Sequence, residues 1–282
     1  MEENLQSKKS PHSWLKWILL ISVALLAVFV AINTIDGKQS RDNPQTNITD
    51  DSSAQDSQNA SKYWVQSADG WQSVGTPIAC PEPLAFSSIT ELDEATSVLY
   101  PGQMRSVGYE PTAGFRFDRS PNEAISITAP MNGEIVQAAR FLVGEETQYV
   151  FDVLSPCGIL NRFDHLLEIP FKLQAMIDKL PEPKENDSRS TPISPPIKIF
   201  QGETIATAVG MRKNNNTFIS WTAYDLRQKN KISSNSTWAA EHPGLYHYVI
   251  CPFPYMPSED QARIKTLPAA DSMSGSKSDF CD

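Results

Sequence analysis

The apolar residues of this chain fall into three regions of different texture. A near-continuous apolar run extends from Trp14 to Ile32, interrupted only by one lysine and one serine. Residues 36–62 consist mainly of Asp, Asn, Gln, Ser and Thr, a composition that cannot bury a core. From Tyr63 onward, short apolar segments alternate with turn residues. We therefore expect a transmembrane helix over residues 14–35, then a disordered tether, then a folded domain.

Residues 63–230 are predicted to form a β-rich domain. The segments AISITAPMNGEIVQAARFL, TQYVFDVL and GILNRFDHLL are short and partly alternating, and turn residues such as Asn132-Gly133 separate them. The segments IKIFQGETIATAVG and TFISWTAYDLR continue the same pattern. Short alternating strands with tight turns are typical of antiparallel sheets, so we expect a mainly β fold with a few short helices.

Two segments have helical features, and a third lacks the pattern of any regular element. Ser88 to Tyr100 begins with candidate helix caps and is followed by Pro101-Gly102, which would end a helix. Phe171 to Leu180 carries apolar side chains at helical spacing. Residues 181–196 are rich in proline, and we expect an irregular insertion there.

Residues 231–282 are predicted to be a C-terminal extension that packs back on the domain. Within it, Tyr246-His247-Tyr248 has the alternation of a half-buried strand. Two of the four cysteines of the chain lie in this extension, and outside the cytoplasm all four are candidates for disulfides. Four cysteines allow three pairings, among which spacing does not choose. The candidates are Cys80, Cys157, Cys251 and Cys281.

Charges on either side of the apolar run predict its orientation. Lys8 and Lys9 precede the run and Asp36 follows it closely, so residues 1–13 are expected in the cytoplasm and residues after 35 outside it. The alternative is a cleaved signal peptide, but no small-x-small cleavage site follows the run. We therefore expect a single-pass membrane protein with an uncleaved signal anchor and an extracytoplasmic C-terminal domain.

The overall charge argues against one large class of partner. The chain carries 33 acidic and 24 basic side chains, a net charge of −9. Nucleic-acid binding requires a basic face that neutralises phosphate, so no nucleic-acid partner is expected. The sequence also lacks glycine-rich nucleotide loops and the G-x-S-x-G nucleophile motif.

Four stretches, taken in order, resemble the lysostaphin- and LytM-like zinc endopeptidases. ITAPMNGEIV is similar to their V-x-A-P-x-x-G-x-V, RFDHLLEI to Y-x-H-L-x-x-I, and IFQGETIATAVG to V-x-x-G-x-x-I-x-x-x-G. SWTAYDLR lies where that family has H-L-H-F-E-V-R. The match extends from Gly114 to Arg227. It implies a duplicated hybrid motif, a small antiparallel barrel or sandwich, with tight hairpins at Asn132-Gly133 and Gly202-Glu203.

The resemblance is informative chiefly through the residues that are missing. The family holds zinc with a histidine and an aspartate of an H-x-G-x-D-like loop and with the second histidine of H-x-H. If Asp118 is the aspartate of this loop, Gly114 stands in the place of the first histidine. If the loop is shifted by two residues, Thr112 stands in the place of the histidine and Arg116 in the place of the aspartate. H-x-H becomes Trp221-Thr222-Ala223. Catalytic zinc requires three protein ligands, so we expect no bound metal or other cofactor.

Of the family's proton-handling histidines, only His165 remains, and Asp118 is the other remnant. We expect His165 to bond a backbone carbonyl or Asp118. Arg116 with Asp118 either recognises a peptide terminus or forms a salt bridge that closes a loop, and Trp221 is expected to stack on a sugar or peptide. The candidate residues of the ligand groove are Arg116, Asp118, His165, Trp221 and Tyr224.

The sequence therefore predicts a non-catalytic, peptidase-like domain that binds or scaffolds at the cell envelope. Peptidoglycan, a peptide or an envelope protein is the expected partner, in addition to the membrane that holds the N-terminal helix. One alternative is an active cell-wall or peptide zinc endopeptidase with a rearranged metal site of His165, His242 and His247. The other is an adaptor subunit of a transport system, although the long heptad helices of such adaptors are absent from the sequence between Val136 and Ile199.

Overall fold

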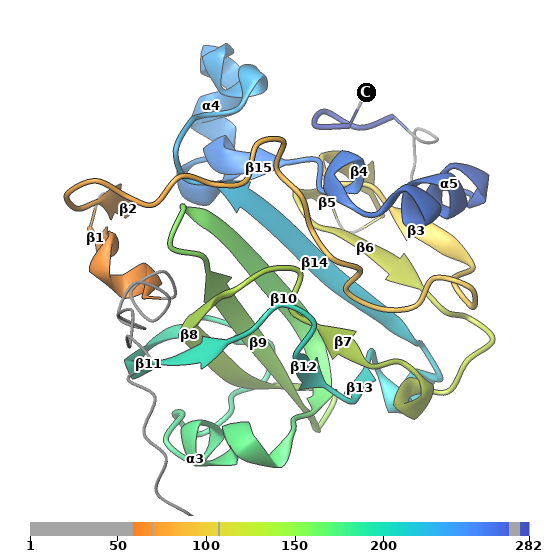
Figure 1. Ribbon diagram of the computed structural model, residues 1–282. Coiled ribbons are helices and arrows are strands. Elements are labelled where there is room, and N and C mark those ends of the chain that lie inside the picture. The colour runs from red at the N-terminus through yellow and green to blue at the C-terminus, as the bar shows by residue number, and fades with distance from the viewer. Residues whose placement is uncertain (1–58, 69, 107, 271–276, 282) are drawn as a thin grey trace, which may run out of the picture. The chain divides into compact units, whose positions relative to one another are not determined.

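The computed structural model describes residues 59–68, 70–106, 108–270 and 277–281. Over these residues the protein is mainly β, with antiparallel strands and short helices, as predicted (Figure 1). The predicted cytoplasmic segment, the membrane helix and most of the tether lie outside them. Within the described part, no helix is both long and apolar enough to span a membrane.

One large sheet organises the domain. Its strand order is β11-β8-β9-β10-β14-β6-β3, with β13 paired to β10 and β15 paired to β14. The strands of this sheet are β3 (Ser97–Leu99), β6 (Ala113–Arg116), β8 (Gly133–Val143), β9 (Glu146–Leu154), β10 (Ile159–Glu168), β11 (Thr191–Ile199), β13 (Ala208–Val209), β14 (Phe218–Asp225) and β15 (Val249–Ile250).

Smaller elements surround the large sheet. Three two-stranded sheets are formed by β1 (Trp64–Ser67) with β2 (Gly70–Ser73), β4 (Gln103–Arg105) with β5 (Gly108–Glu110), and β7 (Ile127–Thr128) with β12 (Thr204–Ala206). The α-helices are α3 (Gln174–Ile177), α4 (Ser236–Glu241) and α5 (Ser258–Thr266). The 3₁₀ helices are η1 (Ala60–Lys62), η2 (Asn122–Ala124), η3 (Phe171–Leu173), η4 (Arg212–Asn214), η5 (Lys231–Ser234), η6 (Gly244–Tyr248) and η7 (Phe253–Tyr255).

The central strands are covered by apolar side chains on both faces. Along β14, Trp221 and Ala223 belong to the main core, whereas Tyr224 belongs to a second apolar cluster with Trp64. Adjacent residues of a strand point to opposite faces, so this division follows from the pleat. Coverage on both faces explains why the strands of the sequence alternate only in part.

The helix predicted over Ser88–Tyr100 is wrong. The segment instead forms bends that bury Ile89 and Leu92, followed by β3, which pairs with β6. The Arg263 side chain accounts for part of this, because it donates to the carbonyls of Leu92 (3.1 Å), Asp93 (3.0 Å) and Ala95 (2.9 Å). Those carbonyl groups are thereby satisfied without a helix. The predicted helix over Phe171–Leu180 is present as η3 and α3.

Three further boundaries differ from the sequence predictions. The Pro-rich insertion is not irregular throughout, because residues from Thr191 onward form β11, an edge strand where proline is tolerated. The predicted tether ends early, since Ala60 is already fully buried against the second cluster. Tyr246–Tyr248 is helical in η6 rather than extended, and the Asn230 side-chain amide holds this turn by donating to the carbonyls of Tyr246 (2.8 Å) and Val249 (3.2 Å).

The two predicted hairpin turns pair with each other instead of closing separate hairpins. β7 pairs with β12 and β8 pairs with β11, and the Ala129 backbone bonds those of Gly202 (2.9 Å) and Glu203 (3.0 Å). Gly202 has the positive φ (76°) expected of a turn glycine. Gly133 serves a different purpose, because a Cβ there would lie 2.7 Å from the Leu154 carbonyl oxygen.

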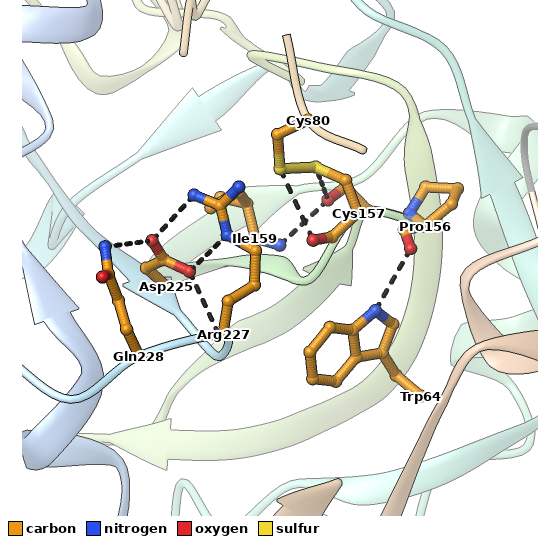
Figure 2. The surroundings of a disulfide bond; sticks show 9 residues. Trp64, Cys80, Pro156, Cys157, Ile159, Asp225, Arg227 and Gln228 are labelled. Carbon is orange, nitrogen blue, oxygen red and sulfur yellow. Dashed lines mark hydrogen bonds and ion pairs between the residues drawn. A yellow bond between two sulfur atoms is a disulfide. The ribbon is translucent and has the colours of Figure 1, made fainter. Parts of the chain in front are cut away.

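Two disulfides, Cys80–Cys157 and Cys251–Cys281, resolve the pairing that spacing left open. Figure 2 shows the first of them beside Trp64, whose indole N–H donates to the Pro156 carbonyl at 3.1 Å. The C-terminal extension adds β15 to β14 and carries the second bridge. The segments before and after the sheet are therefore covalently fastened.

Candidate functional site

The structure does not bring all the predicted groove residues together. The Trp221 ring is fully buried, packs edge-on against Phe86 (5.7 Å between centroids) and donates from its indole N–H to Asn161 Oδ1 at 3.0 Å. Tyr224 is also buried, but in the cluster on the opposite face of the sheet. The prediction that Trp221 and Tyr224 line one groove is wrong, since residues three apart on a strand face opposite ways.

Arg116 and Asp118 form the salt bridge that the sequence analysis considered. Arg116 donates from Nη2 to Asp118 Oδ1 at 2.9 Å and to Asn216 Oδ1 at 3.0 Å. The Thr96 hydroxyl donates to the other oxygen of Asp118 at 2.6 Å. Although burial raises the pKa of the Asp118 carboxyl, the hydrogen bonds from Thr96 and Arg116 hold it below its ordinary value. Both residues thus fasten the end of β6 to its neighbours.

Arg116 and His165 do share a cavity, which has a volume of about 310 Å³. Its walls come from β6, β10 and β14, and from the hairpin of β4 and β5, which Figure 1 places beside β6. We name it the hairpin cavity. The lining residues are Leu99, Arg105, Ser106, Glu110, Thr112, Arg116, Asp164, His165, Asn216, Phe218 and Ser220.

His165 is held in the cavity wall by an unusual backbone conformation and a defined hydrogen bond. Its φ is 63°, where β10 has an irregular register with β9. The left-handed region costs a non-glycine residue roughly 1–2 kcal/mol, and such residues concentrate at functional sites. His165 Nδ1 lies 2.7 Å from Oε1 of the buried Gln148, whose amide nitrogen donates to the Gly210 carbonyl at 3.1 Å.

The Gln148 bond replaces the partners that we predicted for His165, a backbone carbonyl or Asp118. Because the Gln148 amide nitrogen already donates to Gly210, its oxygen is the atom that faces the imidazole. A neutral His165 therefore donates from Nδ1 and has Nε2 left as an acceptor. The Phe218 ring, 4.6 Å away between centroids, fixes the ring from another side.

Among the cavity residues that the sequence reasoning missed, four bear on the chemistry of the site: Arg105, Glu110, Asp164 and Ser220. Arg105, only 7% exposed, donates to the Thr112 hydroxyl (3.0 Å) and carbonyl (2.6 Å) and to the Tyr100 carbonyl (2.9 Å). Asp164 and Ser220 lie within the resembling stretches, next to His165 and Trp221, and only the alternation of side chains along a strand could have predicted that they face the cavity. Arg105 and Glu110 precede those stretches, and no sequence pattern marked them as site residues.

Burial raises the pKa of Glu110, and the negative charge of Asp164 raises it further, whereas Arg105 and His165 oppose the shift. No hydrogen bond or ion pair to the Glu110 carboxylate occurs within the described residues. A half-buried carboxylate without a bonded partner is costly, so Glu110 is a group of the hairpin cavity that a ligand could stabilise.

The three histidines of the alternative metal site lie in two different surroundings. His242 stacks on Tyr109 (4.3 Å between centroids), and both His242 and His247 contact Trp238. His165 contacts Phe218 and Gln148. Across the part of the chain that the structure describes, no group of three or more His, Cys, Asp or Glu side chains is arranged to hold a metal ion.

Two larger cavities elsewhere contain none of the predicted groove residues. One of about 580 Å³ lies against the C-terminal extension beside Phe253 and the Cys251–Cys281 bridge. Another, of about 570 Å³, lies beside Glu91 and Asp260. The hairpin cavity is smaller, yet it combines charged groups with the strained His165, so we treat it as the candidate site.

Comparison with family models, with curated proteins and with solved structures found no match to this chain. The fold and the cavity thus define its class by themselves: a disulfide-bonded, mainly β domain with a small charged cavity on its principal sheet.

Proposed function

We propose that this chain is a membrane-anchored, extracytoplasmic domain of the lysostaphin- and LytM-like type that has lost catalysis and binds a ligand at the cell envelope. The expected ligand is a peptide, from peptidoglycan or from an envelope protein. Two features support the duplicated hybrid motif: the order of the four resembling stretches, and the pairing of the A-P-x-x-G turn with the later Gly202-Glu203 turn.

The observation that carries the proposal is that the residues at the family's H-x-H positions are buried and cannot bind zinc. Trp221 and Ala223 are both 0% exposed and face the main core. Phe86 and Tyr255 lie over this region, and their rings are 5.8 Å apart between centroids. The side chains of Trp221 and Ala223 have no group that coordinates zinc, and their burial keeps both from contact with a ligand. A hydrolase of the family's usual design is therefore not expected.

The hairpin cavity supports a binding function in place of the lost chemistry. At about 310 Å³ it lies at the lower end of the range for ligand pockets, so it accommodates a side chain or a chain terminus rather than a whole oligomer. His165 and Arg116, the surviving groove residues, are held rigidly by Gln148 and by Asp118. A preorganised wall of this kind favours recognition.

The proposal is tested on the full chain, purified in detergent, by elemental analysis after zinc loading and by co-sedimentation with peptidoglycan. We expect less than a tenth of an equivalent of zinc, and binding that His165→Gln weakens several-fold. His247→Gln, outside the cavity, is the matched control and retains binding. Stoichiometric zinc that is lost in His165→Gln would instead support the rearranged endopeptidase, with His242 and His247 as the next ligands to replace.

A further inference from the structure

The guanidinium donors around the hairpin cavity are already engaged by the protein. Arg105 donates to Thr112 and to the Tyr100 carbonyl, and Arg116 donates to Asp118 and Asn216. A carboxylate or phosphate entering the cavity would have to compete with these internal bonds. The guanidinium groups of the wall therefore bond the protein itself rather than a ligand.

Acceptors, in contrast, remain available to a ligand. The Glu110 carboxylate has no bonded partner among the described residues, and Asp164 uses one oxygen, Oδ1, to accept from the His165 backbone N–H at 2.7 Å. In the neutral imidazole, His165 Nε2 is left as an acceptor because Nδ1 faces Gln148 Oε1. These three groups come from β5 and β10 and line the same cavity.

Ser220 adds an independent polar group to the cavity wall. The residue is only 9% exposed and lines the cavity, and its hydroxyl has no hydrogen-bond partner within the described chain. The hydroxyl is not among the fully enclosed atoms that lack a partner, so it is open to the cavity and available to an incoming polar atom. A hydroxyl accepts as readily as it donates.

The distribution of charge in the wall, rather than its sum, favours a cation. Glu110 and Asp164 balance Arg105 and Arg116 in number, but both guanidinium groups are bonded within the protein, whereas the Glu110 carboxylate has no bonded partner among the described residues. A metal ion is disfavoured because no group of three His, Cys, Asp or Glu ligands assembles in the described residues. The remaining cation of suitable size is organic.

We propose that the hairpin cavity binds a primary ammonium group, with the Glu110 carboxylate as its counter-ion and Ser220 and Asp164 as further acceptors. An ammonium carries three N–H donors and no acceptor, which matches a wall whose unsatisfied groups accept. The inference rests on the proposed binding function and names its ligand chemistry. Such an ammonium occurs at a peptide amino terminus and on a lysine-like side chain, and both sources fit the cavity.

The test titrates the full chain in lipid nanodiscs with small probes while the imidazole C–H signals are followed by NMR. The chain has four histidines, and the His165 signal is assigned by its absence in His165→Gln. The probes are alaninamide for an α-ammonium, N-acetyl-lysine amide for a side-chain ammonium, and N-acetyl-alaninamide and N-acetyl-alanine as neutral and anionic controls. We expect at least one amine to shift the His165 signal and both controls to leave it unchanged.

Variants then locate the counter-ion. Glu110→Gln is expected to weaken amine binding about tenfold or more, because a hydrogen bond to a charged group is lost. Ser220→Ala is expected to weaken it two- to tenfold, while Glu94→Gln, which removes the same charge from an exposed position outside the cavity, leaves it unchanged. Equal amine affinity in Glu110→Gln and the parent chain would overturn the assignment.

The outcomes separate this inference from the proposed function. If N-acetyl-alanine or N-acetyl-alaninamide shifts His165 and the amines do not, the cavity binds a ligand of another chemistry and only the ammonium assignment fails. If no probe shifts His165 and peptidoglycan binding is also insensitive to His165→Gln, both fail. If Glu110→Gln does not fold, Ser220→Ala with the Glu94→Gln control decides the result.

Discussion

At the scale of single residues, Gly158 illustrates how tightly the second apolar cluster is built. Its φ is 93°, and a Cβ there would lie 2.2 Å from Cζ2 of Trp64. That ring cannot withdraw freely, because its indole N–H is bonded to the Pro156 carbonyl (Figure 2). A side chain at position 158 must therefore displace Trp64 or the backbone.

We predict that Gly158→Ala lowers the free energy of unfolding by about 2–4 kcal/mol, from overpacking added to left-handed backbone strain. Gly202→Ala is the matched control, because Gly202 also has a positive φ (76°) but no atom within 4 Å of the new Cβ. It should lose only about 1 kcal/mol. Urea unfolding measures both, and similar losses in the two variants would contradict the packing argument.

At this scale the sequence predicted the site in part. Arg116, Asp118 and His165 were identified from the resembling stretches, and the structure places Arg116 and His165 in one cavity. Trp221 was wrongly assigned to the groove, because a motif position whose residue has been replaced does not show whether the new side chain faces the groove or the core. Glu110 could not be found, since only the fold brings its hairpin to β6 and β10.

At the scale of elements, the two disulfides close loops of different length. Cys80–Cys157 joins residues 77 apart and fastens the segment before β3 to the turn between β9 and β10. Cys251–Cys281 joins residues 30 apart within the C-terminal extension. Longer loops lose more chain entropy when they are closed, so the two bridges differ in the restriction they impose on the unfolded chain.

We predict that replacing Cys80 and Cys157 by serine costs roughly 4.5 kcal/mol on the chain-entropy model, and that replacing Cys251 and Cys281 costs roughly 3.6 kcal/mol. Denaturant unfolding of the two double variants measures the difference. A larger loss for the shorter loop would contradict the entropic account and point to packing around the second bridge.

The elements also mark the limit of prediction from sequence. The long strands β8, β9, β10 and β14 follow the apolar segments, because period-two patterning is a local property. The Ser88–Tyr100 helix failed because a distant side chain, Arg263, satisfies carbonyls that a helix would otherwise pair. The first part of β11, from Thr191 to Pro196, was missed because its prolines are tolerated only at a sheet edge, which sequence does not locate.

At the scale of the whole molecule, a buried ion pair couples folding to pH. Asp152 on β9 is 1% exposed and accepts from Arg162 Nη1 on β10 at 3.2 and 3.3 Å. Burial raises the pKa of Asp152 from 3.8 to about 6, and the attraction of Arg162 only partly opposes this rise. The folded state therefore binds a proton more tightly than the unfolded chain does.

The sign of the linkage follows directly. A group whose pKa is higher in the folded state favours folding below the unfolded pKa, and this contribution is lost as pH rises toward the folded value. We predict that Asp152 alone lowers the free energy of unfolding by about 2 kcal/mol between pH 4 and pH 6.

The difference in pH slope between the parent chain and Asp152→Asn, from urea unfolding across that range, measures this contribution. The slope rather than the absolute stability is compared, because the substitution also leaves Arg162 without its partner. Asp93→Asn, at an exposed position, keeps the parent slope. An unchanged slope in Asp152→Asn would contradict the assignment.

The two margins of the principal sheet have a consequence for how copies of the protein meet. β11 forms one margin, and Pro192, Pro195 and Pro196 give it no amide hydrogen at three of its nine positions. At the other margin, the Val98 backbone already pairs with Pro268 and Ala270. Neither margin offers a continuous ladder to a neighbouring strand, so concentrating the protein in a small volume does not template sheet-to-sheet aggregation.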